Sequence, residues 1–133
     1  MFTVSKRSQY GIRALVYLAR KPERAAPAAE ISKSQGISAK YLEGILTTLV
    51  SAGLLVSERG KNGGMRLALD PGSLTMLDVV QALDGKVRPV PCLDLADGCS
   101  LERACLPRRF WLGLRSTIEA YLGSKTLKDV AEI

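Results

Sequence analysis

The N-terminal part of the chain repeats apolar positions with the period of an α-helix. Residues 8–21 place them on one face, as expected for a helix that packs against a core. Pro22 ends this helix, 22–27 is a connector, and 28–35 predicts a shorter second helix that Gly36 stops. The apolar positions of the first helix are Tyr10, Ala14, Tyr17 and Leu18.

A third helix is predicted from Ala39 to about Ala52, after a tight turn at 36–38. Its buried face carries Leu42, Ile45, Leu46, Leu49 and Val50. Its other side and N-terminal end present Ser38, Lys40, Tyr41, Glu43 and Thr47. Two helices joined by a short glycine-containing turn are typical of a helix-turn-helix, which inserts its second helix into the DNA major groove. An ordinary helical hairpin has the same periodicity.

The next segment favours the DNA-binding interpretation. Strands at 54–59 and 65–69 flank the sequence GKNGG, which predicts a β-hairpin with a flexible basic tip, a wing. Arginine is favoured in a narrow minor groove, and glycine lets the backbone approach a phosphate. A nucleotide-binding loop is disfavoured, because neither the P-loop spacing nor the dinucleotide fingerprint is present. The basic residues of the wing are Arg59, Lys61 and Arg66, and its glycines are Gly60, Gly63 and Gly64.

The C-terminal half predicts a helix from 75 to about 83, a helix of about four turns from Pro107, and a short helix from Thr126. The long helix carries a broad apolar stripe: Phe110, Trp111, Leu114, Ile118, Tyr121 and Leu122. Such a stripe suits dimerisation, since paired DNA-binding helices need a two-fold partner, or burial within the same subunit.

The predicted fold class is therefore mostly α with a small β-hairpin wing. Residues 1–70 form a winged helix-turn-helix DNA-binding domain. Residues 71–133 hold a cysteine loop at 92–105 and a long C-terminal dimerisation helix.

Three cysteines lie within 14 positions, spaced C-x6-C-x5-C, in a loop bounded by glycine and proline. An odd number of cysteines argues against a disulfide framework and leaves metal ligation, redox chemistry or burial as small apolar residues. The chain has no histidine, which excludes His-based catalytic triads and imidazole metal ligands. No pair of a nucleophile and a base is recognisable, so no enzyme and no substrate are predicted.

Charge separates the two halves of the 133-residue chain. Residues 1–69 have 11 Lys and Arg against 4 Asp and Glu, a net charge of +7, whereas residues 70–133 have 8 against 9. A basic half joined to a near-neutral half indicates contact with a polyanion. The first residues lack the apolar run of a signal peptide, and no uncharged stretch is long enough to span a bilayer. We expect a cytoplasmic protein with no membrane role.

With these features the chain resembles the IscR/NsrR/RirA family of bacterial winged-helix transcription regulators, along nearly its whole length. The resemblance rests on five features: SKRSQYGIRALVYLA, EISKSQGISAKYLEGILTTLVSAGLL, RGKNGG, the three cysteines and FWLGLRSTIEAYLGSKTLKDV.

The resemblance implies a homodimer that binds a double-stranded DNA operator and holds a 2Fe-2S or 4Fe-4S cluster. It implies a regulator, expected to be a repressor, that senses iron, cluster status, nitric oxide or redox state. The implied cluster ligands are Cys92, Cys99 and Cys105. The implied DNA contacts are Ser38, Lys40, Tyr41, Glu43, Arg59, Lys61, Gly63 and Gly64. The implied dimer contacts are Phe110, Trp111, Leu114, Ile118 and Leu122.

The chain departs from its relatives at the fourth cluster ligand. Some relatives use a histidine three residues after the last cysteine, where this chain has Arg108. Others use a carboxylate of the partner subunit near the start of the first helix, where this chain has Ser8 or Gln9. An iron left open would favour a labile, sensing cluster. The remaining candidates, besides water or a small thiol, are Gln9, Asp94, Asp97 and Glu102.

Two other functions fit the cysteines. A metal-free regulator could switch by a reversible disulfide between two of them. A small electron-carrying iron-sulfur protein would need neither the basic half nor the wing, and is therefore disfavoured.

Overall fold

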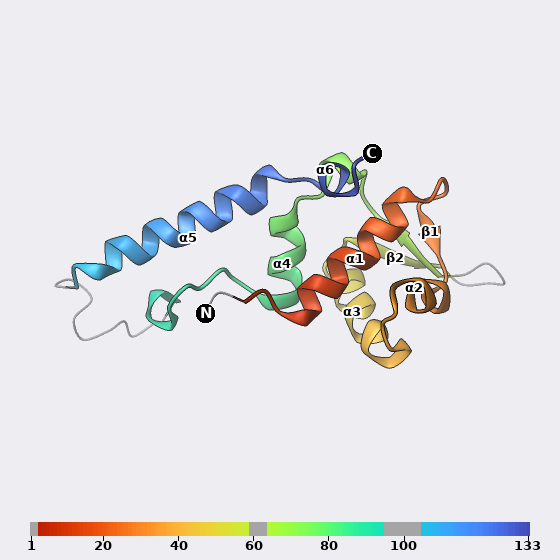
Figure 1. Ribbon diagram of the computed structural model, residues 1–133, viewed down its shortest axis with the longest axis horizontal. Coiled ribbons are helices and arrows are strands. Elements are labelled where there is room, and N and C mark those ends of the chain that lie inside the picture. Colours follow the sequence, from red (N-terminus) through yellow and green to blue (C-terminus); the bar gives the residue numbers. More distant parts are fainter. Residues whose placement is uncertain (1–2, 59–63, 95–104) are drawn as a thin grey trace.

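A computed structural model describes residues 3–58, 64–94 and 105–133 of the chain. Most of the described residues are helical, with a small antiparallel sheet and a long C-terminal helix (Figure 1), as predicted. The elements are α1 Lys6–Arg20, β1 Ala25–Ala26, α2 Ala28–Gln35, α3 Ala39–Ser51, β2 Leu55–Glu58, β3 Gly64–Leu67, η1 Pro71–Ser73, α4 Met76–Asp84, η2 Pro91–Asp94, α5 Pro107–Ser124 and α6 Leu127–Ala131.

Helix α1 lies at the centre of the core and packs against α2, α3, α4 and α6. Its buried residues are Ser8, Gly11, Ala14, Leu15, Leu18 and Ala19. The predicted face contained Ala14 and Leu18, which are fully buried, but also Tyr10 and Tyr17, which are only partly buried. The tyrosines lie at the edge of the face because a phenol group needs a polar partner, and Tyr17 donates its hydroxyl hydrogen to Glu30 over 2.5 Å.

Side-chain caps set where the helices begin. Ser5 Oγ accepts a hydrogen bond from the Ser8 backbone N–H, so α1 begins two residues before the predicted start. Ser38 caps α3 in the same way, as predicted. Thr75 and Thr126 each begin a capping box, at the starts of α4 and α6.

The sheet has three strands in the order β1-β3-β2, one strand more than the predicted hairpin. Strand β3 pairs with β2 as expected, and on its other side Ala25 pairs with Arg66 and Ala26 with Met65. Two alanines between charged residues and a proline carry no strand pattern, so β1 could not be predicted. Strand β2 begins at Leu55, one residue after the predicted start at 54, and β3 runs from Gly64 to Leu67 where 65–69 was predicted.

The core includes residues on both sides of position 70. Leu127 N–H donates to the Leu74 carbonyl over 2.7 Å, and Met76 N–H donates to the Lys125 carbonyl over 2.8 Å, so the starts of α4 and α6 are joined. Helix α6 then packs against α1. Helix α5 lies along α4 at one end and extends away from the other helices (Figure 1). The division of functions at residue 70 stays a prediction.

Gly64 should be required for the three-stranded sheet. A Cβ atom at Gly64 would lie 2.4 Å from the Ala26 carbonyl oxygen and 2.6 Å from Pro27 Cα. These are backbone atoms of the neighbouring strand segment, which cannot rotate away. We expect Gly64→Ala to lower the free energy of unfolding by about 1–3 kcal/mol, measured by urea denaturation.

Gly44→Ala is the matched control, because a Cβ atom at Gly44 meets nothing within 4 Å. Gly44 lies inside α3, where alanine should stabilise by roughly 0.5–1 kcal/mol. Equal stability of Gly64→Ala and the wild type would contradict the close packing of β1 against β3.

Candidate nucleic-acid interface and cysteine segment

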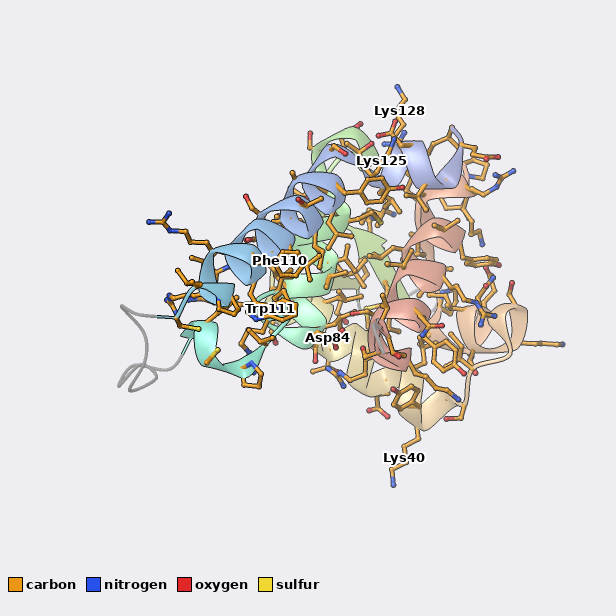
Figure 2. The ribbon with its side chains drawn as sticks, turned by 60° about the vertical axis from the view of Figure 1, so that its left-hand side comes forward. Lys40, Asp84, Phe110, Trp111, Lys125 and Lys128 are labelled. Atoms are coloured by element: carbon orange, nitrogen blue, oxygen red, sulfur yellow. The ribbon has the colours of Figure 1, made fainter. Side chains whose placement is uncertain are left out.

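Helix α3 has one buried and one exposed face, as a recognition helix requires. Leu42, Ile45, Leu46 and Leu49 are buried on the core side. The exposed positions include Ser38, Lys40, Tyr41, Glu43, Gly44 and Thr47. Figure 2 shows Lys40 pointing away from the body of the molecule. The residues predicted to read DNA from this helix therefore share one accessible surface.

Helix α1 holds α3 at two places. The rings of Tyr10 and Tyr41 meet edge to face, with centroids 5.7 Å apart, and the guanidinium of Arg13 lies 5.5 Å from the Tyr10 centroid. Further along α3, Arg7 Nη2 donates to Thr48 Oγ1 over 3.1 Å. Tyr41 is 39% exposed, and its edge-to-face contact with Tyr10 orients the ring. Sequence reasoning missed these supports, because no local pattern shows which α1 side chains meet α3.

The predicted wing contacts Arg59, Lys61 and Gly63 lie outside the described residues. Gly64 lies at the start of β3, packed against β1. Arg66 forms an ion pair with Glu58 across the sheet and donates to the Glu23 carbonyl over 2.8 Å. The hydrogen bond to Glu58 raises the pKa of Arg66. Arg66 is thus bonded to its neighbours at the sheet. The predicted basic cluster at the tip of the wing therefore depends on Arg59 and Lys61.

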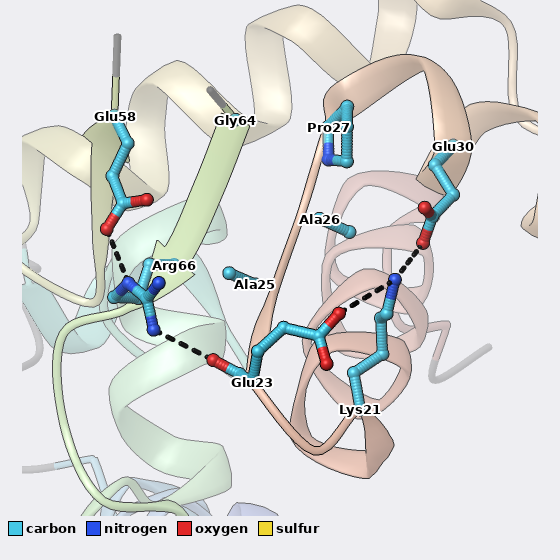
Figure 3. Close-up of a pocket in the computed structure, with 9 residues that line it drawn as sticks. All are labelled: Lys21, Glu23, Ala25, Ala26, Pro27, Glu30, Glu58, Gly64 and Arg66. Atoms are coloured by element: carbon cyan, nitrogen blue, oxygen red, sulfur yellow. Dashed lines mark hydrogen bonds and ion pairs between the residues drawn. The ribbon is translucent and has the colours of Figure 1, made fainter. Parts of the chain in front are cut away.

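A pocket of about 450 Å³ lies at the base of the wing, where the end of α1 and the start of α2 face the three-stranded sheet (Figure 3). Lys21 Nζ lies 2.5 Å from Glu30 and 3.3 Å from Glu23. Hydrogen bonds from Lys21 and then Tyr17 lower the pKa of Glu30, and the bond to Glu30 raises the pKa of Lys21. The ion pairs of Lys21 thus offset part of the negative charge of Glu23 and Glu30. They connect the end of α1 to α2, and exposed ion pairs of this kind contribute little to the free energy of folding.

The described cysteines flank the part of the chain that holds Cys99. Cys92 lies on η2 and Cys105 just before α5, and both are free thiols with partial exposure. Helix η2 contacts α5, so the two thiols come from neighbouring elements. Cys99, Asp97 and Glu102 lie outside the described residues, as does the side chain of Asp94. Within residues 3–58, 64–94 and 105–133, no three His, Cys, Asp or Glu residues are grouped to hold a metal.

The polar side chains in the first turn of α1 form hydrogen bonds within the same chain. Ser8 is fully buried and donates its hydroxyl hydrogen to Asp84 over 2.6 Å, so it is not available as a ligand. Gln9 is exposed, and its amide nitrogen donates to the Val4 carbonyl over 2.7 Å. Of these two residues, Gln9 stays the candidate for a weak oxygen ligand.

The predicted dimerisation helix exposes much of its apolar stripe. None of residues 107–124 is buried, and Phe110 and Tyr121 are 66% and 64% exposed. Phe110 packs edge to face on Trp111, with ring centroids 4.9 Å apart (Figure 2). Leu122 packs against the core of its own chain, and Ile118 lines a small pocket with Val4 and other residues. Leu114 is half-buried. Phe110 and Tyr121 are therefore the most exposed large apolar side chains within α5, and Leu106, directly before the helix, is 85% exposed.

No helix among the described residues is long and apolar enough to cross a membrane.

Known families and proteins match nearly the whole chain. The Rrf2 family model, described as an iron-dependent transcriptional regulator, matches residues 4–133. The HTH-type transcriptional regulator IscR of Xenorhabdus nematophila is 32% identical over 97% of this chain and 79% of its own length. The IscR of Aliivibrio salmonicida is 34% identical over 96% of this chain and 76% of its own length.

Solved structures share the fold. CymR (YrzC), the global cysteine regulator of B. subtilis, has a TM-score of 0.80 at 28% identity, over 99% of this chain and 98% of its own. T. potens IscR has a TM-score of 0.78 at 29% identity, over 98% of this chain and 87% of its own. These matches confirm the predicted winged helix-turn-helix fold with a long C-terminal helix.

Proposed function

Because this chain belongs to the Rrf2 family of transcriptional regulators, we propose that it is an iron-sulfur-dependent repressor that binds operator DNA as a homodimer. The observation that carries the proposal is the exposed polar face of α3, which stands opposite its buried leucines and is held in place by α1. The basic first half of the chain supplies the attraction to DNA phosphates.

The recognition helix would enter the major groove with its N-terminal end. Lys40, Tyr41 and Glu43 lie within its first five residues and are exposed, where side chains of a recognition helix reach base edges. Ser38 caps the helix N-terminus, and this end would lie close to the phosphates that flank the groove. Arg59, Lys61, Gly63 and Gly64 are assigned to the wing contact, with Arg59 in the minor groove.

The cysteine segment has the donor chemistry that an iron-sulfur cluster needs. Cys92 and Cys105 are free thiols on neighbouring elements, and Cys99 lies between them in the sequence. Thiolates are the usual protein ligands of such clusters. A cluster bound there would supply a centre that responds to oxygen, nitric oxide or iron supply. The fourth ligand is assigned to Gln9, Asp94, Asp97 or Glu102, or to a molecule from solvent.

The homodimer would form along α5. An 18-residue helix without a buried residue leaves the apolar stripe half-covered, and a second copy of the same stripe would cover it. The two recognition helices would then be related by a two-fold axis, which fits a palindromic operator.

A metal-free thiol switch is the second candidate function. It is favoured by the free, partly exposed thiols of Cys92 and Cys105. The iron content of protein purified without oxygen separates the two candidates. An iron-free and sulfide-free protein that forms a reversible disulfide would favour the switch.

Replacing Lys40 should weaken operator binding. We expect Lys40→Ala to reduce affinity by about 1–3 kcal/mol and to relax the preference for the operator over random DNA, because a base contact is lost. Fluorescence anisotropy at several salt concentrations measures both. Lys128→Ala is the control, since Lys128 lies on α6, at the far end of the molecule from Lys40 (Figure 2). Equal effects of the two variants would contradict the assignment of α3.

Replacing Cys99 should remove the cluster but not the fold. We expect Cys99→Ala to be a folded dimer without visible iron-sulfur absorption and with altered operator affinity. Absorption spectroscopy and counts of iron and sulfide after anaerobic purification provide the measurement, with the wild type prepared in parallel. Unchanged absorption would exclude Cys99 from the ligands.

A charge at Phe110 should dissociate the dimer. Phe110 is 66% exposed in the single chain, so Phe110→Asp should leave the subunit folded while placing a carboxylate in the apolar contact. Light scattering should then give the monomer mass. Val130→Asp, which changes an exposed apolar residue of α6, should remain a dimer. A dimeric Phe110→Asp would contradict the proposed interface.

A further inference from the structure

The end of α4 is bonded to the start of α1 through one carboxylate. Ser5 Oγ lies 2.6 and 2.7 Å from the two carboxylate oxygens of Asp84, and Ser8 Oγ lies 2.6 Å from Oδ2. Ser8 is fully buried beneath Asp84, which is itself exposed, so the Ser8 hydroxyl group depends on this carboxylate for its partner. Figure 1 shows the two helix ends meeting.

Close packing beside this bond keeps the two helices together. A Cβ atom at Gly11 would lie only 2.4 Å from Leu83 Cδ1, so the backbone of α1 approaches the last turn of α4 closely. The two helices therefore meet through both a hydrogen-bonded carboxylate and an apolar contact. A displacement of the end of α4 would be transmitted to the first turns of α1 rather than absorbed by a loose contact.

The same stretch of α1 also holds the recognition helix. Arg7 bonds to Thr48 of α3, and Tyr10 packs on Tyr41. Ser8, which bonds to Asp84, lies between Arg7 and Tyr10 in the sequence. One turn of α1 thus contacts α4 on one side and α3 on the other.

The other neighbour of Asp84 is the segment that leads to the cysteines. Gly85 follows at a φ of 83°, and the chain continues through residues 86–90 to η2 and Cys92. Val87 and Pro89 share a pocket of about 190 Å³ with Val4 and with Ile118 of α5. Asp84 therefore lies near three parts of the molecule: the turn of α1 that contacts the recognition helix, the segment that leads to the cysteines, and α5.

We propose that Asp84 is a positioning residue that couples the cysteine segment to the recognition helix. This inference rests on the proposed function and names how the two sites communicate. When the position of residues 85–92 differs between two states of the cysteine segment, the Asp84 bonds to Ser5 and Ser8 carry the difference to α1. Through Arg7 and Tyr10, α1 then changes how α3 is presented to DNA. Coupling of this kind requires that the two states differ in their affinity for the operator.

The experiment compares operator affinity in cluster-loaded and cluster-free dimers. Asp84→Ala removes the carboxylate that accepts from Ser5 and Ser8, and Ser8→Ala removes the buried hydroxyl from the other side of the bond. Gln81→Ala, an exposed change one turn earlier on α4, is the matched control. The measurements are anisotropy with operator DNA, the visible absorption of each variant, and amide hydrogen exchange of residues 39–51 in cluster-free protein.

In the wild type and in Gln81→Ala, cluster loading should change operator affinity within the range of about 5- to 150-fold that is usual for coupled sites. In Asp84→Ala and in Ser8→Ala this ratio should fall toward 1, while the visible absorption stays at the wild-type level. Amide exchange in α3 should become faster in both variants, because α1 no longer holds one arrangement.

Two results would overturn the inference. If both variants lose affinity equally in the two forms, so that the ratio stays at its wild-type value, the Asp84 bond only stabilises the fold. The proposed function would survive that result. If the wild type itself shows the same affinity with and without the cluster, the proposed function and the inference both fail.

Discussion

The close packing of other helices against the small residues of α1 is the constraint on which the structure depends. Gly11, Ala14 and Ala19 are buried, and a larger side chain at Gly11 would overlap Leu83. Small residues let helix axes approach, so α1 can contact α2, α3, α4 and α6. The element that carries no proposed DNA contact itself therefore determines the position of the helix that does. It also brings the end of α4, and with it the start of the cysteine segment, within hydrogen-bond distance of the same turn.

The winged part gains its order from contacts outside the hairpin. Strand β3 is central because β1 pairs with it, and Gly64 permits that pairing by leaving room for the Ala26 carbonyl. Arg66 is held by Glu58 and the Glu23 carbonyl, and Lys21 by Glu30. Exposed ion pairs contribute little stability, so their role is to orient the base of the wing rather than to stabilise the fold. The positive charge proposed to contact DNA on this side belongs to Arg59 and Lys61.

The described C-terminal half exposes apolar side chains of α5 and carries two partly exposed thiols. The end of α5 is anchored through the bonds that join the starts of α4 and α6, whereas its beginning carries the exposed Phe110 next to Cys105. An exposed apolar stripe beside free thiols fits a unit completed by a second copy, which is the arrangement proposed for the dimer. In the proposed cluster, Arg108 and Ser8 or Gln9 stand where relatives have a histidine or a carboxylate, so the fourth ligand would come from residues near the cysteines, from Gln9 or from solvent.

The sequence by itself determined the helices, their order and the exposed face of α3. These follow from local rules: apolar spacing, Gly36 and Gly85 as stops, and Ser38, Thr75 and Thr126 as caps. It also determined the family, because the helix-turn-helix, wing and cysteine motifs occur together in one chain.

Only the tertiary structure decided how these parts meet. Strand β1 consists of two alanines and exists because β3 accepts it, so no periodicity could predict it. The buried face of α1 shifted from its tyrosines to Ser8, Gly11 and Leu15, since burial depends on which helix lies opposite. The bonds of Asp84 to Ser5 and Ser8 join residues 79 and 76 positions apart. Such contacts depend on the packing of two helices in space, which a pattern along one chain does not contain.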